Sequence, residues 1–359
     1  MQKRWLILFL LVTLPFAAPA QFDYQINADD TITITDYLAS DDVVIIPAKF
    51  IKWKVTSIGP EAFSSRSNIT SVTIGTNVTS IGKYAFYRCT SLTNVAIPAS
   101  VTSIGADAFN SCWSLSSVTL PSSLTTIGNF AFSGCGNLTS VTIPSSVTYI
   151  EDRPFQGCNR LNAITVDALN LAYSSVDGVL FNKSRTLLIQ CPGNKSGTYR
   201  IPGTVTNIGI GAFVHCTRLT NVIIPNSVID ISHMAFCWCP GLTSVTIPNS
   251  VSTIGSCAFY GCTDLATLTL GSNLTSIRAN AFSGCARLAS LVIPNSVTNI
   301  DSFAFSGCTG LKAVYFKGNA PGIGTSIFDH TTNVTVHYLP GTTNWSPTFD
   351  NRPTAVWKP

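Results

Sequence analysis

The chain has few side chains that can ionise. Charged residues make up 11% of its 359 residues, compared with about a quarter in ordinary soluble domains. It contains 4 histidines, and its glutamates are Glu61 and Glu151 alone. Acid–base or nucleophilic catalysis needs titratable side chains that converge, and no G-x-S-x-G, H-E-x-x-H or phosphate-loop pattern occurs. We therefore expect no enzyme, no catalytic residue and no cofactor.

The chain also lacks a large charge of either sign. Its formal net charge is +4, and two of the positive charges, Lys3 and Arg4, lie in a segment that we expect to be removed. About +2 then remains, too little for electrostatic attraction to dominate binding. This balance excludes nucleic acid and anionic membrane as the main ligand.

Residues 1–20 resemble a secretory signal peptide. Lys3 and Arg4 give a basic start, an apolar stretch follows, and Ala18-Pro19-Ala20 offers a small-residue cleavage site. An uncleaved membrane anchor is the alternative, but the apolar stretch is short for a bilayer span. No later segment is long and apolar enough to cross a membrane. We expect a secreted or cell-surface protein with no transmembrane segment after cleavage.

A repeat of 23 residues organises the rest of the sequence. One phenylalanine marks it in two uninterrupted runs. These residues are Phe63, Phe86, Phe109, Phe132 and Phe155, followed by Phe213, Phe236, Phe259, Phe282, Phe305 and Phe328. A fixed period between about 20 and 50 residues is typical of solenoids and other repeat arrays.

Each repeat carries the spacing L-x-x-V-x-I, for example from Leu138 to Ile143. This spacing matches the core of a leucine-rich repeat, and the alternation around V-x-I indicates a short strand. A proline usually follows and should end the strand. Strands 23 residues apart must then pair in parallel, one coil above the next.

The predicted fold class is a β-rich solenoid. It is a leucine-rich repeat array of about a dozen coils or more, with a parallel sheet on one face. Short strands, turns and brief helical pieces around Ala-Phe-x-Gly-Cys should form the other. We expect a signal peptide at 1–20, an N-terminal cap hairpin at 21–42 and the solenoid at 43–340. An inserted hairpin near 170–200 would interrupt the array, and residues 341–359 would form a C-terminal cap or tail.

Twelve cysteines in a secreted chain would usually indicate disulfides, but nine of them follow the repeat. Each of the nine lies three residues after a repeat phenylalanine. They are Cys89, Cys112, Cys135, Cys158, Cys216, Cys239, Cys262, Cys285 and Cys308. One small buried thiol per coil suits a column in the interior.

The remaining three cysteines, Cys191, Cys237 and Cys257, lie outside this ladder. Together with His233, the sequences HMAFCWC and CAFYGC are compatible with a zinc site, although such spacings are weak evidence for one. A Cys237–Cys257 disulfide is a second alternative. We favour unpaired structural thiols and expect no metal.

The motifs IPNSVTNI, SIGxxAFxGC and YSSVDGVLFNKSRTLLIQCP resemble the BspA-type leucine-rich repeats of bacterial surface proteins. The similarity extends over roughly residues 40–340. It implies a bacterial secreted or surface-associated binding protein, of a kind often linked to adhesion to host proteins or other cells. It supplies no catalytic residues.

The outward strand positions are the candidate binding face. Most carry Ser or Thr, which could be a solvated face where β-branched Thr favours the strand, or a flat hydroxyl-rich surface that docks a ligand. Tyr315 makes the late coils the better candidate, because aromatic residues dominate binding energy. The candidate residues are Asn94, Thr119, Thr142, Asn221, Ile223, Thr246, Thr269 and Tyr315.

The leading hypothesis is non-catalytic binding of an extracellular protein or glycan, with adhesion as its purpose. The main alternative is a structural envelope or matrix protein without a discrete ligand. A remoter alternative is a surface that orders water or ice, since the hydroxyl rows would be about 4.8 Å apart.

Overall fold

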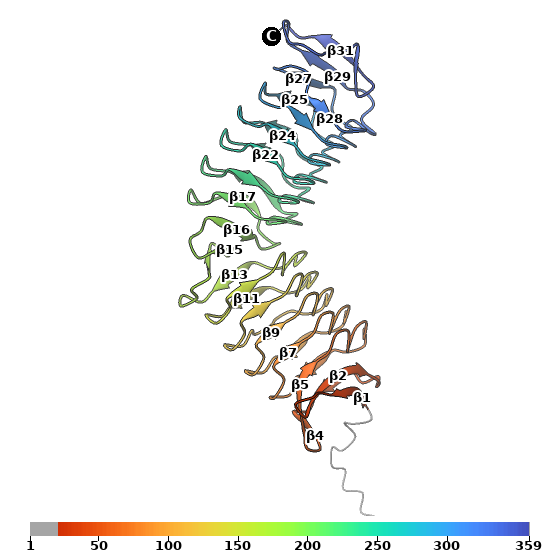
Figure 1. Ribbon diagram of the computed structural model, residues 1–359, viewed down its shortest axis with the longest axis vertical. Helices are drawn as coiled ribbons and strands as arrows, with labels where there is room; N and C mark the ends of the chain where they lie inside the picture. The colour runs from red at the N-terminus through yellow and green to blue at the C-terminus, as the bar shows by residue number, and fades with distance from the viewer. Residues whose placement is uncertain (1–20, 359) are drawn as a thin grey trace, which may run out of the picture.

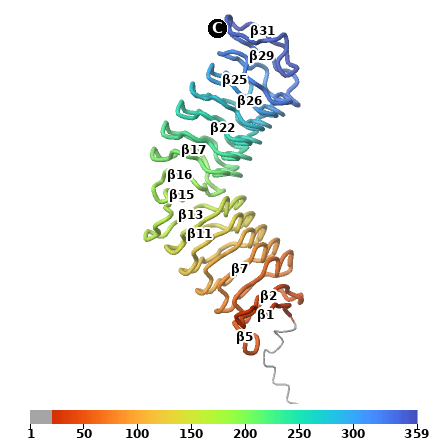
Figure 2. Tube along the Cα trace, in the orientation of Figure 1, coloured from red at the N-terminus to blue at the C-terminus, as the bar shows by residue number. Residues whose placement is uncertain are grey.

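The structure, a computed structural model, describes residues 21–358. The predicted signal peptide lies outside the described residues. Figure 1 shows one elongated, curved stack of coils, with β1 near one end and β31 at the other. The tube in Figure 2 shows successive coils lying side by side along the whole length. The predicted β-rich solenoid is confirmed.

One face of the stack, here called the broad face, carries the longer parallel strands, which are the V-x-I segments of the repeats. In chain order these are β3 (Val43–Ile45), β6 (Ser71–Thr73), β8 (Asn94–Ala96), β11 (Ser140–Ile143), β13 (Ala163–Val166), β17 (Gly197–Arg200), β19 (Leu219–Ile223), β21 (Ser244–Thr246), β23 (Thr267–Thr269), β25 (Ser290–Ile293), β27 (Ala313–Phe316), β29 (Thr335–Tyr338) and β31 (Arg352–Val356).

A second face, here called the narrow face, carries mostly two-residue strands that also pair in parallel. They are β5 (Trp53–Ile58), β7 (Ser80–Ile81), β9 (Ser103–Ile104), β10 (Thr126–Ile127), β12 (Tyr149–Ile150), β16 (Leu187–Gln190), β18 (Asn207–Ile208), β20 (Asp230–Ile231), β22 (Thr253–Ile254), β24 (Ser276–Ile277), β26 (Asn299–Ile300) and β28 (Gly322–Ile323). Partners lie one repeat apart, as in Ser80↔Ser103.

The remaining strands lie at the ends of the stack and at its interruption. At the N-terminus β1 (Phe22–Ile26) pairs antiparallel with β2 (Thr31–Tyr37), which pairs in parallel with β5. β4 (Lys49–Phe50) pairs with β5. At the C-terminus β30 (Thr348–Phe349) pairs antiparallel with β31. The domain boundaries given above remain predictions.

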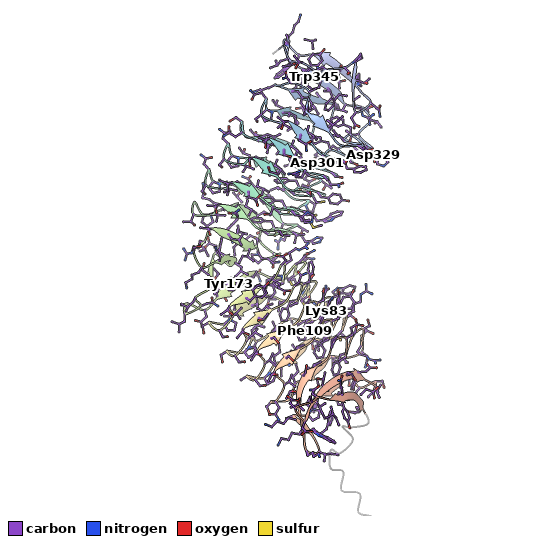
Figure 3. The ribbon with its side chains drawn as sticks, in the orientation of Figure 1. Lys83, Phe109, Tyr173, Asp301, Asp329 and Trp345 are labelled. Carbon is purple, nitrogen blue, oxygen red and sulfur yellow. The ribbon has the colours of Figure 1, made fainter. Side chains whose placement is uncertain are left out.

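An antiparallel segment interrupts the array between Phe155 and Phe213. β14 (Tyr173–Val176) pairs with β15 (Val179–Asn182), and β15 pairs with β16. The hairpin predicted near 170–200 has two strands, whereas this segment has three, of which the first, β14, carries Tyr173 (Figure 3). The buried hydrophobic residues form two clusters, one in the N-terminal half of the stack and one in the C-terminal half. Leu180 packs in the first and Phe181 in the second, so β15 joins the two halves.

The repeat phenylalanines form two columns of stacked rings inside the coils. Phe86 and Phe109 are fully buried, with ring centroids 5.1 Å apart and planes 5° apart; Phe109 is marked in Figure 3. Phe236 and Phe259 repeat this geometry at 5.0 Å. Each inner ring lies between two others of its column, and the rings at the column ends, such as Phe155 and Phe213, have a column neighbour on one side only.

The Ala-Phe-x-Gly-Cys segments form turns, and the expectation of brief helical pieces there was wrong. Two residues in each repeat adopt left-handed backbone angles, one two positions before the phenylalanine and one two positions after it. Around Phe236 these are Met234, with φ 57°, and Trp238, with φ 55°. Left-handed residues cannot continue a right-handed helix.

This backbone geometry turns alternate amides toward the next coil. Met234, Phe236 and Trp238 donate their N–H groups to the carbonyl oxygens of Ser256, Ala258 and Tyr260, at 2.9, 2.7 and 2.7 Å. The turn thus joins coils in the manner of a strand. The turn has an energetic cost, because each residue with a side chain that adopts the left-handed conformation loses about 1–2 kcal/mol.

Gly284→Ala should therefore lower the free energy of unfolding by about 1–2 kcal/mol. Gly284 has φ +75°, but an added Cβ would meet its nearest neighbour at an ordinary 3.6 Å, so the cost is conformational and not steric. Denaturant unfolding measures the change. Gly136→Ala is the control, because Gly136 lacks a positive φ and has open space around it. Equal effects of the two substitutions would contradict the role of the left-handed turn.

Candidate functional site

The exposed side chains of the broad face form two columns that run along the stack. Strand register places Asn221, Ser244 and Thr267 in one column. The other contains Thr246 and Thr269. Since alternate residues of a strand point to opposite sides, the residues between them are buried. The broad face therefore presents two outward rows of hydroxyl and amide groups.

The structure distributes the predicted binding residues along this face and does not gather them into one patch. Asn94 and Asn221 occupy one column, and the others occupy the second. The exposed members are Asn94, Thr119, Thr142, Thr246 and Thr269, and the half-buried ones are Asn221, Ile223 and Tyr315. Thr119 belongs to no strand.

Tyr315 stands in an aromatic group that the sequence did not predict. Its ring lies 4.8 Å from that of His337, which is its register partner on β29, and 5.0 Å from that of Trp357. The backbone of Trp357 is fixed by a hydrogen bond from its N–H to the carbonyl of Tyr338, at 2.7 Å. The late end of the broad face thus carries three aromatic side chains in contact.

The broad face is divided into four parallel sheets, although the narrow face continues through two of the divisions. Residues 117–119 form no strand, so β8 and β11 are separate edges. β23 and β25 are also edges of different sheets. Behind these two breaks, β10 still pairs with β12 and β24 with β26. The coils therefore stay stacked while their broad-face strands separate.

A single residue type marks both breaks. The third inward position of the broad-face segment is leucine only at Leu120 and Leu270. The coil of Leu120 lies within the first break, and the coil of Leu270 precedes the second. Elsewhere in the stack the position carries residues that favour strands. Those residues are Ile46, Ile74, Ile97, Ile143, Val166, Ile201, Ile224, Ile247, Ile293 and Phe316.

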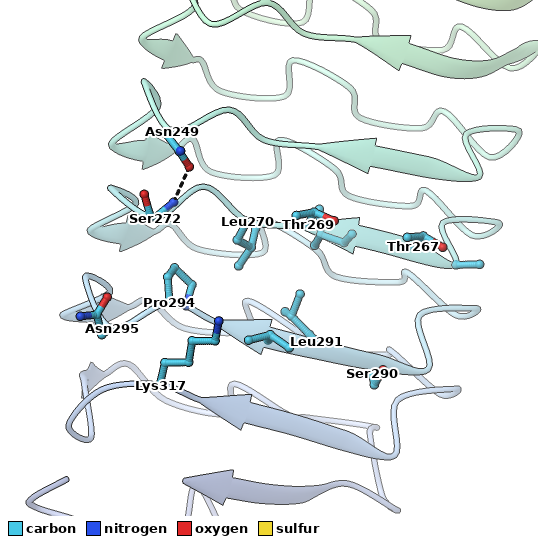
Figure 4. Close-up of a pocket in the computed structure, with 13 residues that line it drawn as sticks. Asn249, Thr267, Thr269, Leu270, Ser272, Ser290, Leu291, Pro294, Asn295 and Lys317 are labelled. Atoms are coloured by element: carbon cyan, nitrogen blue, oxygen red, sulfur yellow. Dashed lines mark hydrogen bonds between the residues drawn. The ribbon is translucent and has the colours of Figure 1, made fainter. Parts of the chain in front are cut away.

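The break between β23 and β25 opens a groove of about 570 Å³, here called the Leu270 groove (Figure 4). Its wall includes the apolar side chains of Leu270 and Leu291, which Figure 4 draws in the opening. Hydroxyls, amides and one ammonium group complete it. They belong to Asn249, Thr267, Thr269, Ser272, Ser290, Asn295 and Lys317. Asn249 Oδ1 accepts a hydrogen bond from the Ser272 N–H at 2.8 Å.

The break between residues 117–119 and β11 opens a second groove of about 320 Å³, here called the Leu120 groove. Every residue that lines it has a counterpart 150 positions later that lines the Leu270 groove. The counterparts keep their polarity except at two places, where Thr142 corresponds to Val292 and Asp167 to Lys317. Both backbone amides donate to the coil before, Asp167 to Ile143 at 2.9 Å and Lys317 to Ile293 at 3.0 Å. The same position thus carries opposite charges in the two grooves.

Sequence reasoning placed Thr119, Thr142 and Thr269 on the face but missed the grooves that they line. Two signals were available in the sequence. Leucine replaces a strand-favouring residue at Leu120 and Leu270, and charged residues, Asp167 and Lys317, occupy a position that is uncharged in nearly all other coils. Because leucine and isoleucine are both apolar, the repeat pattern treats them as equivalent.

The cysteine ladder has the structural role that its spacing predicted. All nine ladder thiols are buried. Cys89 donates its S–H to the carbonyl of Phe63 at 3.1 Å, and Cys262 does the same to Phe236 at 3.1 Å. Burial raises the pKa of both thiols to about 12, so they stay protonated at neutral pH.

The three cysteines outside the ladder are unpaired as well. Cys191 and Cys237 are buried, whereas Cys257 is partly exposed. In residues 21–358 no three His, Cys, Asp or Glu side chains lie close enough together to hold a metal ion. The arrangement around His233 therefore gives no support to a zinc site.

The same repeats match a known family model. Residues 56–187, 194–240 and 229–349 match the BspA type leucine rich repeat region, in 6 copies. The chain belongs to the BspA-type leucine-rich repeat family. This assignment agrees with the resemblance of its motifs. A comparison with curated protein sequences gives no match.

Solved structures of other leucine-rich repeat proteins resemble this family member. A leucine-rich repeat protein from Eubacterium ventriosum has 26% identity and a TM-score of 0.69, over 87% of this chain and 93% of that one. A leucine rich cell surface protein from Faecalibacterium prausnitzii has 27% identity and a TM-score of 0.56, over 89% and 93%. The pneumococcal vaccine antigen PcpA, at 21% identity and a TM-score of 0.64 over 88% and 85%, shares the fold. Between residues 21 and 358, this chain has no helix with the length and apolar character of a membrane span.

Thiol labelling of the native protein should modify Cys257 well before any ladder cysteine, because reagents reach only partly exposed sulfur. Peptide mass spectrometry after timed alkylation measures the order. Cys257→Ser should remove the fast reaction, and unfolding should expose all twelve thiols. A Cys237–Cys257 bridge in the unreduced protein, or equally fast labelling of the ladder, would contradict this assignment.

Proposed function

We propose that this protein is a secreted or surface-exposed, non-catalytic binding protein that docks an extracellular protein or glycan on its broad face, in the service of adhesion. The observation that carries the proposal is the broad face itself. Two rows of exposed hydroxyl and amide groups stand there on a backbone fixed by inter-coil hydrogen bonds, and two grooves open into them. A rigid surface loses little conformational entropy on binding.

Composition and family membership support the same proposal. Repeat proteins bind through extended surfaces that their stacked units create. The similar Faecalibacterium prausnitzii protein is described as a cell surface protein, which agrees with the signal peptide predicted at residues 1–20. The site would use the second exposed column, with Thr246, Thr269 and Tyr315 as candidate contacts.

A screen of the purified chain from residue 21 against a glycan array and extracellular-matrix proteins tests this function. We expect saturable binding to at least one of them. Thr246→Arg, which places a bulky charge on the exposed column, should weaken that binding by about tenfold or more, a change of about 1.4 kcal/mol. Its melting temperature should not change, because Thr246 is exposed.

Thr148→Arg is the matched control, since Thr148 is equally exposed but precedes β12 on the narrow face. It should leave binding and melting temperature unchanged. If Thr148→Arg weakens binding and Thr246→Arg does not, the broad face is the wrong surface. If nothing in the screen binds saturably, the alternative of a structural envelope or matrix protein replaces this proposal.

A further inference from the structure

The Leu270 groove exposes backbone as well as side chains. β23 and β25 face each other across it as edge strands of separate sheets. Edge strands present N–H and C=O groups without strand partners, and such groups need hydrogen bonds from water or a ligand. The groove therefore offers donors and acceptors from two strand edges in addition to its side chains.

The groove is too narrow to take an additional strand. A peptide inserted between β23 and β25 would separate them by roughly 9.6 Å, twice the usual strand spacing. The coils that carry these strands are held close behind the groove, where β24 pairs with β26 and the rings of Phe282 and Phe305 lie 5.7 Å apart. A ligand must therefore enter from the solvent side as a compact group.

The lining indicates the chemistry of that group. Leu270, which is partly exposed, and Val292, which is exposed, give apolar contact, and hydroxyls and amides such as those of Ser272 and Asn295 surround them. A sugar ring has the complementary character, with apolar C–H faces and hydroxyls that both donate and accept. The volume of about 570 Å³ falls in the range of small-ligand sites.

The charge of one side chain, that of Lys317, determines which class of sugar the groove favours. Lys317 is the only ionisable residue that lines the Leu270 groove, its side chain is exposed, and no ion pair of residues 21–358 includes it. An ammonium group attracts a carboxylate at short range. In the Leu120 groove the equivalent Asp167 would repel the same carboxylate.

We propose that the Leu270 groove binds a carboxylate-bearing sugar, a hexuronate residue of an oligosaccharide, with Lys317 on the carboxylate. Asn249, Asn295 and Ser272 contact its hydroxyls, and the apolar wall takes a face of its ring. The inference rests on the proposed function and specifies its ligand class. The Leu120 groove, which is smaller, has no counterpart of Asn249 or Asn295 in its lining and carries the opposite charge, rejects this ligand.

Calorimetric titration of the chain from residue 21 tests the site with three probes. These are a galacturonate tetrasaccharide, a hyaluronan tetrasaccharide and a neutral N-acetylglucosamine tetrasaccharide. At least one acidic probe should bind saturably at one site per chain and at least about tenfold more tightly than the neutral probe, a difference of about 1.4 kcal/mol. Binding of the galacturonate probe would indicate a plant source of the sugar, and binding of the hyaluronan probe an animal source.

Three variants locate the site. Lys317→Glu should weaken the acidic probe by about tenfold or more without a change in melting temperature, because Lys317 is exposed. Leu270→Ile should restore the strand-favouring residue, close the groove and remove binding while the protein stays folded. Asp167→Lys, in the Leu120 groove, should leave the affinity unchanged and the stoichiometry at one, because no counterpart of Asn249 or Asn295 lines that groove.

The proposal is wrong if neither acidic probe binds, if Lys317→Glu or Leu270→Ile leaves binding unchanged, or if Asp167→Lys weakens binding as much as Lys317→Glu does. It is also wrong if an oligoglutamate peptide binds with the same dependence on Lys317, because the ligand would then be an acidic peptide. If the sugar probes fail while another partner still binds in the screen and responds to Thr246→Arg, the proposed function stands without this inference. If neither the sugar probes nor any partner in the screen binds, both the proposed function and this inference are wrong.

Discussion

The fold depends on backbone hydrogen bonds that each coil makes to the next. Strands make them on the broad and narrow faces, and the left-handed turns make them at the phenylalanine corner, as from Phe236 to Ala258. Since a coil can join its neighbours only if all three sides keep the same rise, most partners lie one 23-residue repeat apart, although the last coils depart from that spacing, as in Tyr315↔His337. The one long interruption in the array is closed by its own antiparallel strands, and pairing one repeat apart resumes between β18 and β20.

Most of the architecture was predictable because the repeat reports it many times. The phenylalanine column, the thiol ladder and the parallel strands follow from spacings that recur in nearly every coil. The helical pieces were predicted wrongly because no sequence rule marks the left-handed positions: glycine occupies Gly284 and Gly307, but the same position holds Trp238 and His330. Inter-coil hydrogen bonds stabilise the left-handed conformation in residues for which it is intrinsically unfavourable.

The candidate site was less predictable, because it depends on departures from the repeat. A sequence pattern averages over coils, and the grooves arise where two coils differ from the average by the branching of one side chain, at Leu120 and Leu270. Their charges at Asp167 and Lys317, and the lack of counterparts of Asn249 and Asn295 in the smaller groove, then distinguish the two cavities. The predicted face was a uniform row, whereas the structure gives it two local sites, one on each side of the antiparallel interruption.

The thiol ladder continues in the last coils with a hydroxyl. Thr331 lies one repeat after Cys308, is fully buried, and donates its O–H to the carbonyl of Phe305 at 2.8 Å, just as Cys308 donates to Phe282. What the position requires is a small donor, and sulfur chemistry is incidental to it. A chain built this way needs no oxidising compartment and no disulfide isomerase to mature, and its fold does not depend on the redox state of its surroundings.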